Sequence, residues 1–255
     1  MFAVKNNNVS RKLHLRCHSK FKNMKYLFLL ILSCTAFIVS GQNPKFPPGP
    51  EGWEKDSTLV KFITTLKAAA AGKDVTTFVS LLDKDVMSAF DGGNDVKSFI
   101  INWELMSDST KFWSYLSRAL DIGGGYVNDP NDETGRYKVV YPYVYNYEPA
   151  LEDDTYSMGC IIGKNVNLRE KPDTKAAVKT QLSYDIISFV YDDEGEVRAG
   201  TNSEGNAEWY LVKTYDQKFK GWVNWKYVYG INGPRLFLFK NPAGKWRVSA
   251  FVAGD

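Results

Sequence analysis

The sequence predicts an α+β protein: a helix-rich N-terminal domain with a few strands, then a small all-β barrel, then a terminal β-hairpin. Between residues 56 and 120, apolar residues recur at i, i+3 and i+4, which indicates helices that each bury one face. From residue 126 onward, short segments separated by turn residues indicate strands. We therefore divide the chain into a leader (1–41), a Pro-rich linker (42–55), the helix-rich domain (56–153), the barrel (154–230) and the hairpin (231–255).

The leader has the layout of a secretory signal peptide. Met24 and Lys25 begin a basic segment, a compact apolar run follows, and Val39-Ser40-Gly41 precedes Gln42 as a cleavage site. A run of about thirteen apolar residues is too short for a comfortable membrane span. We expect a periplasmic or extracellular protein without a membrane span after cleavage. Met24 is the expected start, with a long n-region as the alternative, and lipidation at Cys34 is disfavoured because the apolar run continues past it.

Removing the leader changes the charge balance. Residues 1–41 hold seven Lys or Arg and no Asp or Glu, which leaves 25 basic and 29 acidic residues from Gln42 onward. The whole chain carries a formal charge of +3, but the remainder is negative. This balance does not support a nucleic-acid-binding surface.

The leader also holds both histidines and two of the three cysteines, so that only Cys160 remains after cleavage. A Cys–His pair, a Ser–His–Asp triad and an HExxH metal site therefore cannot form, nor can a zinc site that needs His or several Cys. We expect no cofactor and no metal. Cys160 is expected to be a buried, inert thiol, with an intermolecular disulfide as the alternative.

Four helices are expected in the N-terminal domain. The second helix carries apolar residues from Val75 to Leu82, which places Asp83 and Asp85 at its end. Glycines at 72, 92–93 and 123–125 interrupt the helical pattern. The expected N-caps are, in order, Asp56 or Ser57, Asp74, Asn94 or Asp95, and Asp108 or Ser109.

The strand patterns begin with alternating aromatic residues between Tyr137 and Tyr147. Pro142 keeps this expected strand off a central position or bends it. Closely spaced short strands, which are typical of a small closed barrel, follow at residues 166–168, 178–182, 186–191, 209–214 and 220–224. A hairpin is expected from residues 236–239 and 245–252 around the turn at 241–244.

Two segments of the barrel resemble bacterial SH3 domains. They are Asn165-Val166-Asn167-Leu168-Arg169-Glu170-Lys171-Pro172 and, after Trp209-Tyr210-Leu211-Val212, Gly221-Trp222-Val223-Asn224-Trp225-Lys226-Tyr227-Val228. The resemblance covers residues 158–229 and implies an SH3-like barrel that binds a cell-wall peptide or a protein peptide. Trp209, Tyr210 and Trp222 are then expected in its core, and Gly221 allows a close backbone approach. The polar insertion between Val190 and Trp209 departs from the family pattern, and we interpret it as a solvated loop or as part of a binding face.

The N-terminal domain, through Leu66–Asp74 and Ala89–Gly93, resembles NTF2-like α+β domains, which end in a strand like Gly244-Lys245-Trp246-Arg247-Val248. We therefore hypothesise that the terminal hairpin folds back onto this first domain.

The expected ligand-binding residues are Tyr184, Tyr215, Trp225 and Tyr227. Tyr184 and Tyr215 stand near loops, and Trp225 stands where the last strand turns toward Tyr227. An aromatic-lined groove is how SH3-like barrels hold extended peptides. The tyrosines between 137 and 147 are the alternative, as a platform for sugar rings, although alternating aromatics more often form a core face.

Two other functions stay open. The first is a carboxylate-dependent hydrolase of the cell envelope, for which Asp83, Asp85, Asp91 and Glu104 are the candidates. The second is a structural or interaction protein of the envelope. Asp129, Asn131 and Glu133 alternate like calcium ligands, but Gly135 falls one position late, so a polar turn is favoured. The acidic run Asp192-Asp193-Glu194 is likewise interpreted as a solvated loop before an ion site.

Overall fold

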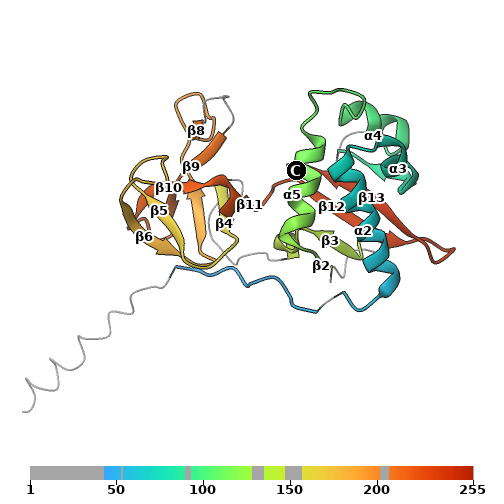
Figure 1. Cartoon of the computed structure of the whole chain (residues 1–255), viewed down its shortest axis with the longest axis horizontal. Helices are drawn as coiled ribbons and strands as arrows, with labels where there is room; N and C mark the ends of the chain where they lie inside the picture. Colours follow the sequence, from blue (N-terminus) through green and yellow to red (C-terminus); the bar gives the residue numbers. More distant parts are fainter. Residues whose placement is uncertain are drawn as a thin grey trace, which may run out of the picture. The chain divides into compact units, whose positions relative to one another are not determined.

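The helices and the last two strands of the chain build one layered domain (Figure 1). The computed structural model describes residues 43–52, 54–89, 93–127, 135–146, 157–201 and 207–254, so the expected leader lies outside the described residues. Within these residues the first sheet has five strands in the order β1-β13-β12-β3-β2. Only β1 and β13 pair in parallel. The strands are β1 (Leu82–Met87), β2 (Gly125–Tyr126), β3 (Val139–Tyr141), β12 (Arg235–Lys240) and β13 (Trp246–Val252).

Helices pack on one face of this sheet, where α2 and α5 lie in front of β12 and β13 in Figure 1. The helices are α2 (Ser57–Gly72), α3 (Val75–Ser80), α4 (Val96–Asn102) and α5 (Phe112–Ile122). Asp56, Asp74 and Asp95 each accept a hydrogen bond from a backbone N–H in the first turn of α2, α3 and α4. Hydrogen bonds to their side chains lower the pKa of all three carboxyls. No helix of the described part of the chain is long and apolar enough to span a bilayer.

Aromatic rings fill the core between the helices and the sheet. Phe112 lies 4.9 Å from Phe78 and 5.1 Å from Phe251, measured between ring centroids. Trp103 lies 4.8 Å from Phe251, and its indole N–H donates to the backbone oxygen of Phe251 at 2.9 Å. These contacts join α3, α5 and β13, so the last strand of the chain is part of the first domain's core.

The expected boundaries of two helices in this domain need correction. The second helix ends at Ser80, and the following residues form β1 because Leu82 and Met87 pair with Val248 and Ala250 of β13. Asp83 and Asp85 therefore lie in a strand. The fourth helix begins at Phe112, not at 108 or 109, after a turn in which the Thr110 hydroxyl accepts from the Phe112 N–H at 3.2 Å.

The expected alternating strand between residues 137 and 147 is also shorter. Only Val139–Tyr141 is a strand, and the cis Tyr141–Pro142 peptide leads into the 3₁₀ helix η1 (Tyr143–Asn146). Residues 147–156 lie outside the described residues. The tyrosines therefore do not share one face: Tyr143 is buried, whereas Tyr145 is 42% exposed.

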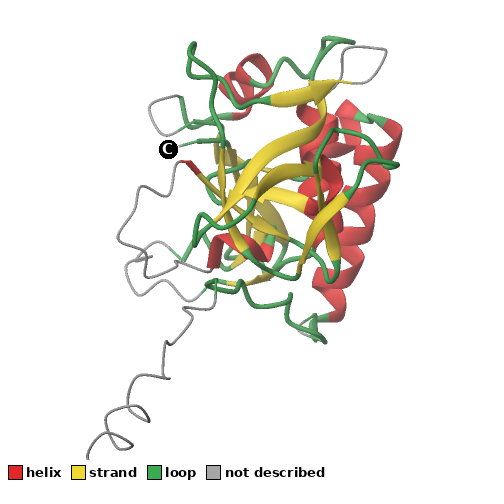
Figure 2. Cartoon of the chain, turned by 90° about the vertical axis from the view of Figure 1, so that its left-hand side faces the viewer, coloured by secondary structure: helices red, strands yellow, loops and turns green. Residues whose placement is uncertain are grey.

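Residues 158–230 form the second sheet, whose strands curl into the barrel seen in Figure 2. Among the described residues the strand order is β11-β4-β7-β9-β10-β5-β6, and β8 pairs with β9. The strands are β4 (Met158–Ile161), β5 (Val166–Arg169), β6 (Val178–Leu182), β7 (Ile186–Phe189), β8 (Ala199–Thr201), β9 (Ala207–Thr214), β10 (Lys220–Asn224) and β11 (Val228–Gly230), with the 3₁₀ helix η3 (Trp225–Tyr227) before β11.

The barrel core is mainly aliphatic, which differs from the sequence expectation. Its buried cluster includes Val166, Leu168, Val212 and Val223, with Phe189 and Tyr210 packed at its margin. Trp222 is only half-buried and points to the other face, because its partner across the sheet is Arg169 rather than a core residue. Trp209 is buried but lies outside this cluster.

The barrel is inserted between two strands of the first sheet. Its first and last strands pair with each other, with Gly159 opposite Gly230, and the Ile231 N–H donates to the Met158 oxygen at 3.1 Å. The chain then returns to the first domain, where β12 pairs with β3 and β13 pairs with β1. The terminal hairpin is thus an inner part of the first sheet.

A third buried cluster joins the Pro-rich segment to the residues that flank the barrel's entry and exit. Phe46 is 1% exposed and packs with Tyr143, Cys160 and Tyr229. The backbone of this segment also binds the barrel: the Ile186 N–H donates to the Pro44 oxygen at 3.0 Å. Lys45 forms a 2.6 Å ion pair with the buried Asp185. Part of the expected linker is therefore fixed on the barrel.

Replacement of Phe251 by alanine tests the contribution of the hairpin to the first domain. We expect Phe251→Ala to lower the free energy of unfolding by about 3–5 kcal/mol, because it removes a fully buried ring that contacts Trp103 and Phe112. Urea denaturation followed by tryptophan fluorescence measures the change. Ile101→Ala is the control, since Ile101 is 61% exposed and should change stability by less than about 0.5 kcal/mol. Equal, small effects would contradict this role of the hairpin.

The reactivity of Cys160 tests whether the cluster at the barrel's entry is buried. This thiol is fully buried, and its burial raises the pKa to about 12. We expect no reaction with a thiol reagent at pH 8 during the time in which the urea-unfolded protein reacts completely. Because the unfolded thiol ionises near pH 8.5 while the folded thiol keeps its proton, stability should fall as pH rises from about 8.5 toward 12. Cys160→Val should reduce this fall, and rapid labelling of the native protein would contradict the burial.

Candidate functional site

The barrel carries an open groove beside β5 and η3, with a volume of about 390 Å³. We call it the cationic groove. Its lining combines amide, aromatic and basic side chains: Lys164, Asn165, Val166, Asn167, Arg169, Thr174, Trp209, Asn224, Lys226 and Tyr227.

Strand register brings the groove residues together on the outer surface of the barrel. In β5, Val166 and Leu168 face the core, so Asn167 and Arg169 face outward. Arg169 pairs with Trp222 of β10. Because β5 and β10 are antiparallel, Asn167 and Asn224, two residues away on their strands, lie opposite each other. Asn224 in turn lies opposite Trp209 of β9. Three neighbouring strands therefore place two amides, a guanidinium and an indole on one face.

Local hydrogen bonds fix the two ends of the groove. Asn165 adopts a left-handed conformation with φ 55°, and its N–H donates to the Ser183 hydroxyl at 2.9 Å. The Asn224 side chain accepts from the Lys226 N–H at 3.1 Å and so caps η3. This short helix presents Lys226 and Tyr227 to the groove.

The groove is positively charged although its domain is neutral. Residues 164–229 contain ten basic and ten acidic residues. Lys164, Arg169 and Lys226 line the groove, whereas none of its described lining residues is acidic. Arg169 is oriented by a 2.6 Å hydrogen bond from its Nη1 to the Ala176 oxygen. The arrangement can hold an extended polar ligand by amide hydrogen bonds, by aromatic contact and by charge.

Of the four residues expected to bind ligand, the structure brings only Tyr227 into the cationic groove. Its side chain is 48% exposed, so a ligand can contact the ring. Tyr184 lies under the Pro-rich segment: its backbone oxygen accepts from the Phe46 N–H at 2.5 Å. Tyr215 is half-buried beside Asp216, whose N–H donates to the Asn43 side chain at 2.9 Å. Neither lines the cationic groove.

Trp225 instead contacts Arg118 of α5. The guanidinium carbon lies 4.3 Å from the centre of the Trp225 ring, and Nη2 donates to the backbone oxygens of Trp225 and Val228. Burial lowers the pKa of Arg118, which nevertheless keeps its charge. Trp225 is therefore a contact that holds η3, and its neighbours Lys226 and Tyr227 are the exposed residues of that helix.

Sequence reasoning missed most of the groove. Lys164, Arg169, Asn224 and Lys226 lie within or next to the segments that resemble bacterial SH3 domains, but the sequence pattern alone does not select them as ligand-binding residues. The alternation of buried Val166 and Leu168 with outward Asn167 and Arg169 was the available signal. The pairing of β9, β10 and β5, which a single sequence does not specify, brings Trp209 to the same surface.

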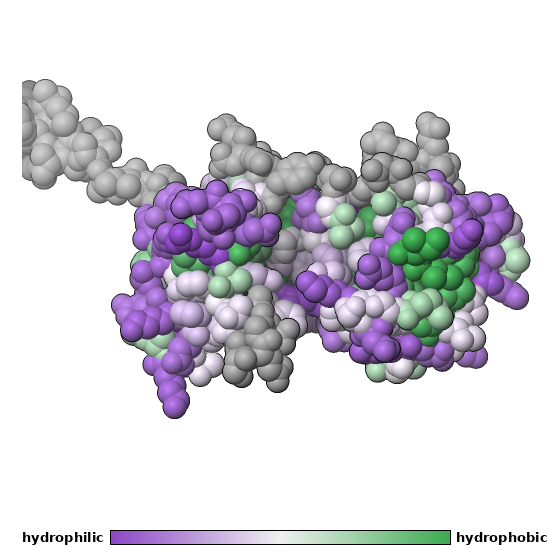
Figure 3. All heavy atoms as spheres, turned by 90° about the horizontal axis from the view of Figure 1, so that it is seen from above, coloured by the Kyte–Doolittle hydropathy of each residue, from purple (hydrophilic) through white to green (hydrophobic). Residues whose placement is uncertain are grey.

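The carboxylates proposed for catalysis lie apart from this groove. Asp83 accepts from Arg136 at 2.9 Å, and Asp85 pairs with Lys84 at 2.5 Å. Glu104 lines an open pocket next to Ile101 and Met106, which are 61% and 77% exposed. Figure 3 shows a hydrophobic patch on this upper face, where α4 lies in Figure 1. Asp91 lies outside the described residues.

The calcium-like residues Asp129, Asn131 and Glu133 also lie outside the described residues. In the insertion, the Asp192 carboxylate accepts from the N–H groups of Glu194 and Glu196 at 3.1 and 2.8 Å, which closes a turn. Asp193 and Glu194 are exposed. Across the described ranges, no group of three or more His, Cys, Asp or Glu could hold a metal ion.

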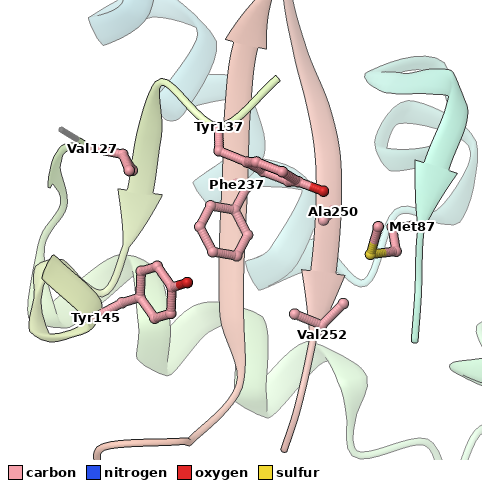
Figure 4. A pocket seen from close by; sticks show the side chains of 7 residues that line it. All are labelled: Met87, Val127, Tyr137, Tyr145, Phe237, Ala250 and Val252. Atoms are coloured by element: carbon pink, nitrogen blue, oxygen red, sulfur yellow. The ribbon is translucent and has the colours of Figure 1, made fainter. Parts of the chain in front are cut away.

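The first domain has a smaller cavity on the sheet face opposite the helices (Figure 4). Its volume is about 120 Å³. Apolar and aromatic side chains from strands and flanking loops line it: Met87, Val127, Tyr137, Tyr145, Phe237, Ala250 and Val252. The Tyr137 and Tyr145 rings each pack edge-on against Phe237, at 5.0 and 5.1 Å.

The small all-β barrel that carries this groove is of the SH3-like class. Residues 164–229 match the bacterial SH3 domain family, so the chain contains a bacterial SH3 domain. Domains of this family bind peptides or cell-wall components and are often found in extracellular or cell-envelope proteins. No curated protein and no solved structure matches the chain. The likeness of the first domain to NTF2-like domains stays a prediction.

Substitution of Gly221 tests the close approach between β10 and β5, the two strands beside the groove. A Cβ atom at this position would lie 2.6 Å from the Arg169 oxygen and 2.9 Å from Leu168 Cγ. We expect Gly221→Ala to displace β5 and to lower the free energy of unfolding by about 1–3 kcal/mol, as measured by urea denaturation. Gly72→Ala is the control, because a Cβ there meets nothing within 4 Å. If both variants were equally stable, β5 and β10 would not be packed as described.

Proposed function

We propose that this protein is an exported, non-catalytic binding module that holds a cell-wall peptide or a protein peptide in the cationic groove of its SH3 domain. The observation that carries the proposal is the groove itself, which is open, polar and built on the family-matched part of the chain. Its volume of about 390 Å³ falls within the range of roughly 300–1,000 Å³ usual for ligand sites.

The lining suits an extended peptide. Asn165, Asn167 and Asn224 offer amide donors and acceptors that can pair with a peptide backbone. The exposed ring of Tyr227 offers apolar surface for a ligand side chain, and the buried indole of Trp209 lines the groove beneath the exposed residues. Such a site gives both the polar contacts that orient a ligand and the apolar area that retains it.

Two considerations favour binding over catalysis. The chain from Gln42 onward has no histidine, and the carboxylates suggested for hydrolysis, Asp83 and Asp85, are engaged with Arg136 and Lys84. The cationic groove offers no pair of carboxylates among its described residues, whereas a glycosidase requires two that flank the scissile bond. The proposal that the protein is exported is based on the leader sequence, residues 1–41.

Retention on purified peptidoglycan tests the proposal. We expect the protein to be retained and Tyr227→Ala to bind about tenfold more weakly, because removal of a contacting tyrosine costs roughly 1–2 kcal/mol. Tyr115→Ala is the matched control, since this tyrosine of α5 is 36% exposed and lies outside the groove. Co-sedimentation over a range of protein concentrations gives the affinities. No retention of the wild-type protein, or equal binding by the two variants, would contradict the proposal.

A further inference from the structure

We infer that the ligand of the cationic groove is a peptide that carries carboxylate groups, which Lys164, Arg169 and Lys226 bind. This inference rests on the proposed function, because it concerns the same groove, and it names the chemistry that the ligand must present.

The positive charge is a property of the groove and not of the barrel as a whole. Residues 164–229 hold equal numbers of basic and acidic residues, yet three bases and no acid appear among the described lining residues. Several acids of the barrel are engaged elsewhere. Asp185 pairs with Lys45, Asp216 pairs with Lys218, and Asp192 closes a turn of the insertion.

The groove cations are available to a ligand. Lys164 and Lys226 are exposed, and within the described part of the chain neither side chain donates a hydrogen bond or forms an ion pair. Arg169 uses Nη1 to bind the Ala176 oxygen, which orients the guanidinium and leaves its other N–H groups for an acceptor. A guanidinium held in this way can bind a carboxylate through two parallel hydrogen bonds. An anion would also relieve the repulsion between three like charges.

A carboxylate peptide fits the remaining lining better than a phosphate-rich polymer does. Asn167 and Asn224 can pair with amide groups, and Tyr227 presents apolar surface along the same groove. A polyanion without amides or side chains would leave these groups without a matching partner.

The first arm of the test compares two forms of one ligand mixture. Peptides released enzymatically from purified peptidoglycan are used either unmodified or after carbodiimide coupling to ammonia, which converts their carboxylates to neutral amides. We expect the amidated peptides to bind the full protein at least about tenfold more weakly in calorimetric titrations. Raising the NaCl concentration should weaken only the binding of the unmodified peptides, since salt screens charge.

The second arm uses charge-neutralising variants. Lys164→Gln with Lys226→Gln should lower affinity for the unmodified peptides about tenfold, or about threefold for each exposed lysine. Affinity for the amidated peptides should not change. Lys213→Gln with Lys220→Gln removes the same charge from the opposite end of the β9–β10 pair and should have no effect. Circular dichroism checks that each variant is folded.

The outcomes separate the two proposals. Equal binding of both peptide forms, with no effect of the groove lysines, would overturn the carboxylate inference and leave the proposed function standing. Binding of neither form, together with no retention on intact peptidoglycan, would overturn both. Tighter binding of a glycerol phosphate polymer than of the unmodified peptides would also overturn the inference, since it would assign the groove to phosphate.

Discussion

The fold depends on backbone pairing between the two ends of the first domain. Strand β13, which ends at Val252, pairs in parallel with β1, and β12 pairs with β3. The hairpin thereby fills the middle of a sheet whose other strands are made more than ninety residues earlier in the sequence. The helices bury their apolar faces against these last strands, so both the hydrogen-bonding of the sheet and the packing of α2 and α5 require the C-terminal residues.

This pairing explains how a complete barrel can stand inside another domain. An inserted domain is tolerated when its ends lie close together, and here β4 and β11 meet at Gly159 and Gly230. The cluster around Phe46, Cys160 and Tyr229 then packs at the same entry point. Arg118 adds a contact from α5 to η3, the helix that carries Lys226 and Tyr227. The groove is thus built on the barrel, while its η3 side is also contacted from the first domain.

The sequence was informative where local patterns decide the structure. The capping aspartates 56, 74 and 95, the α2 stripe and the two bacterial SH3 segments predicted elements that the structure contains. Prediction of the elements failed where strand pairing between distant segments decides the secondary structure. Leu82 continues the apolar pattern of α3, yet it lies in a strand because β13 offers a partner 166 residues away in its register. The aromatic residues were hardest to place, since large rings suit both a core and a groove. Trp225 and Tyr184 are engaged by Arg118 and by the Pro-rich segment, which only the folded chain brings to them.

The position of the hairpin after the barrel in the sequence has a consequence for synthesis. The polypeptide emerges from its N-terminus, so every residue of the barrel is made before residues 235–252 exist. The barrel needs no strand from the hairpin and can close as soon as β11 is available. The first domain must wait, with the apolar faces of α2 and α5 uncovered, until residues 235–252 have been added. The domain that begins before the barrel is therefore completed after it, and during this interval the uncovered helices expose the nascent chain to aggregation and proteolysis.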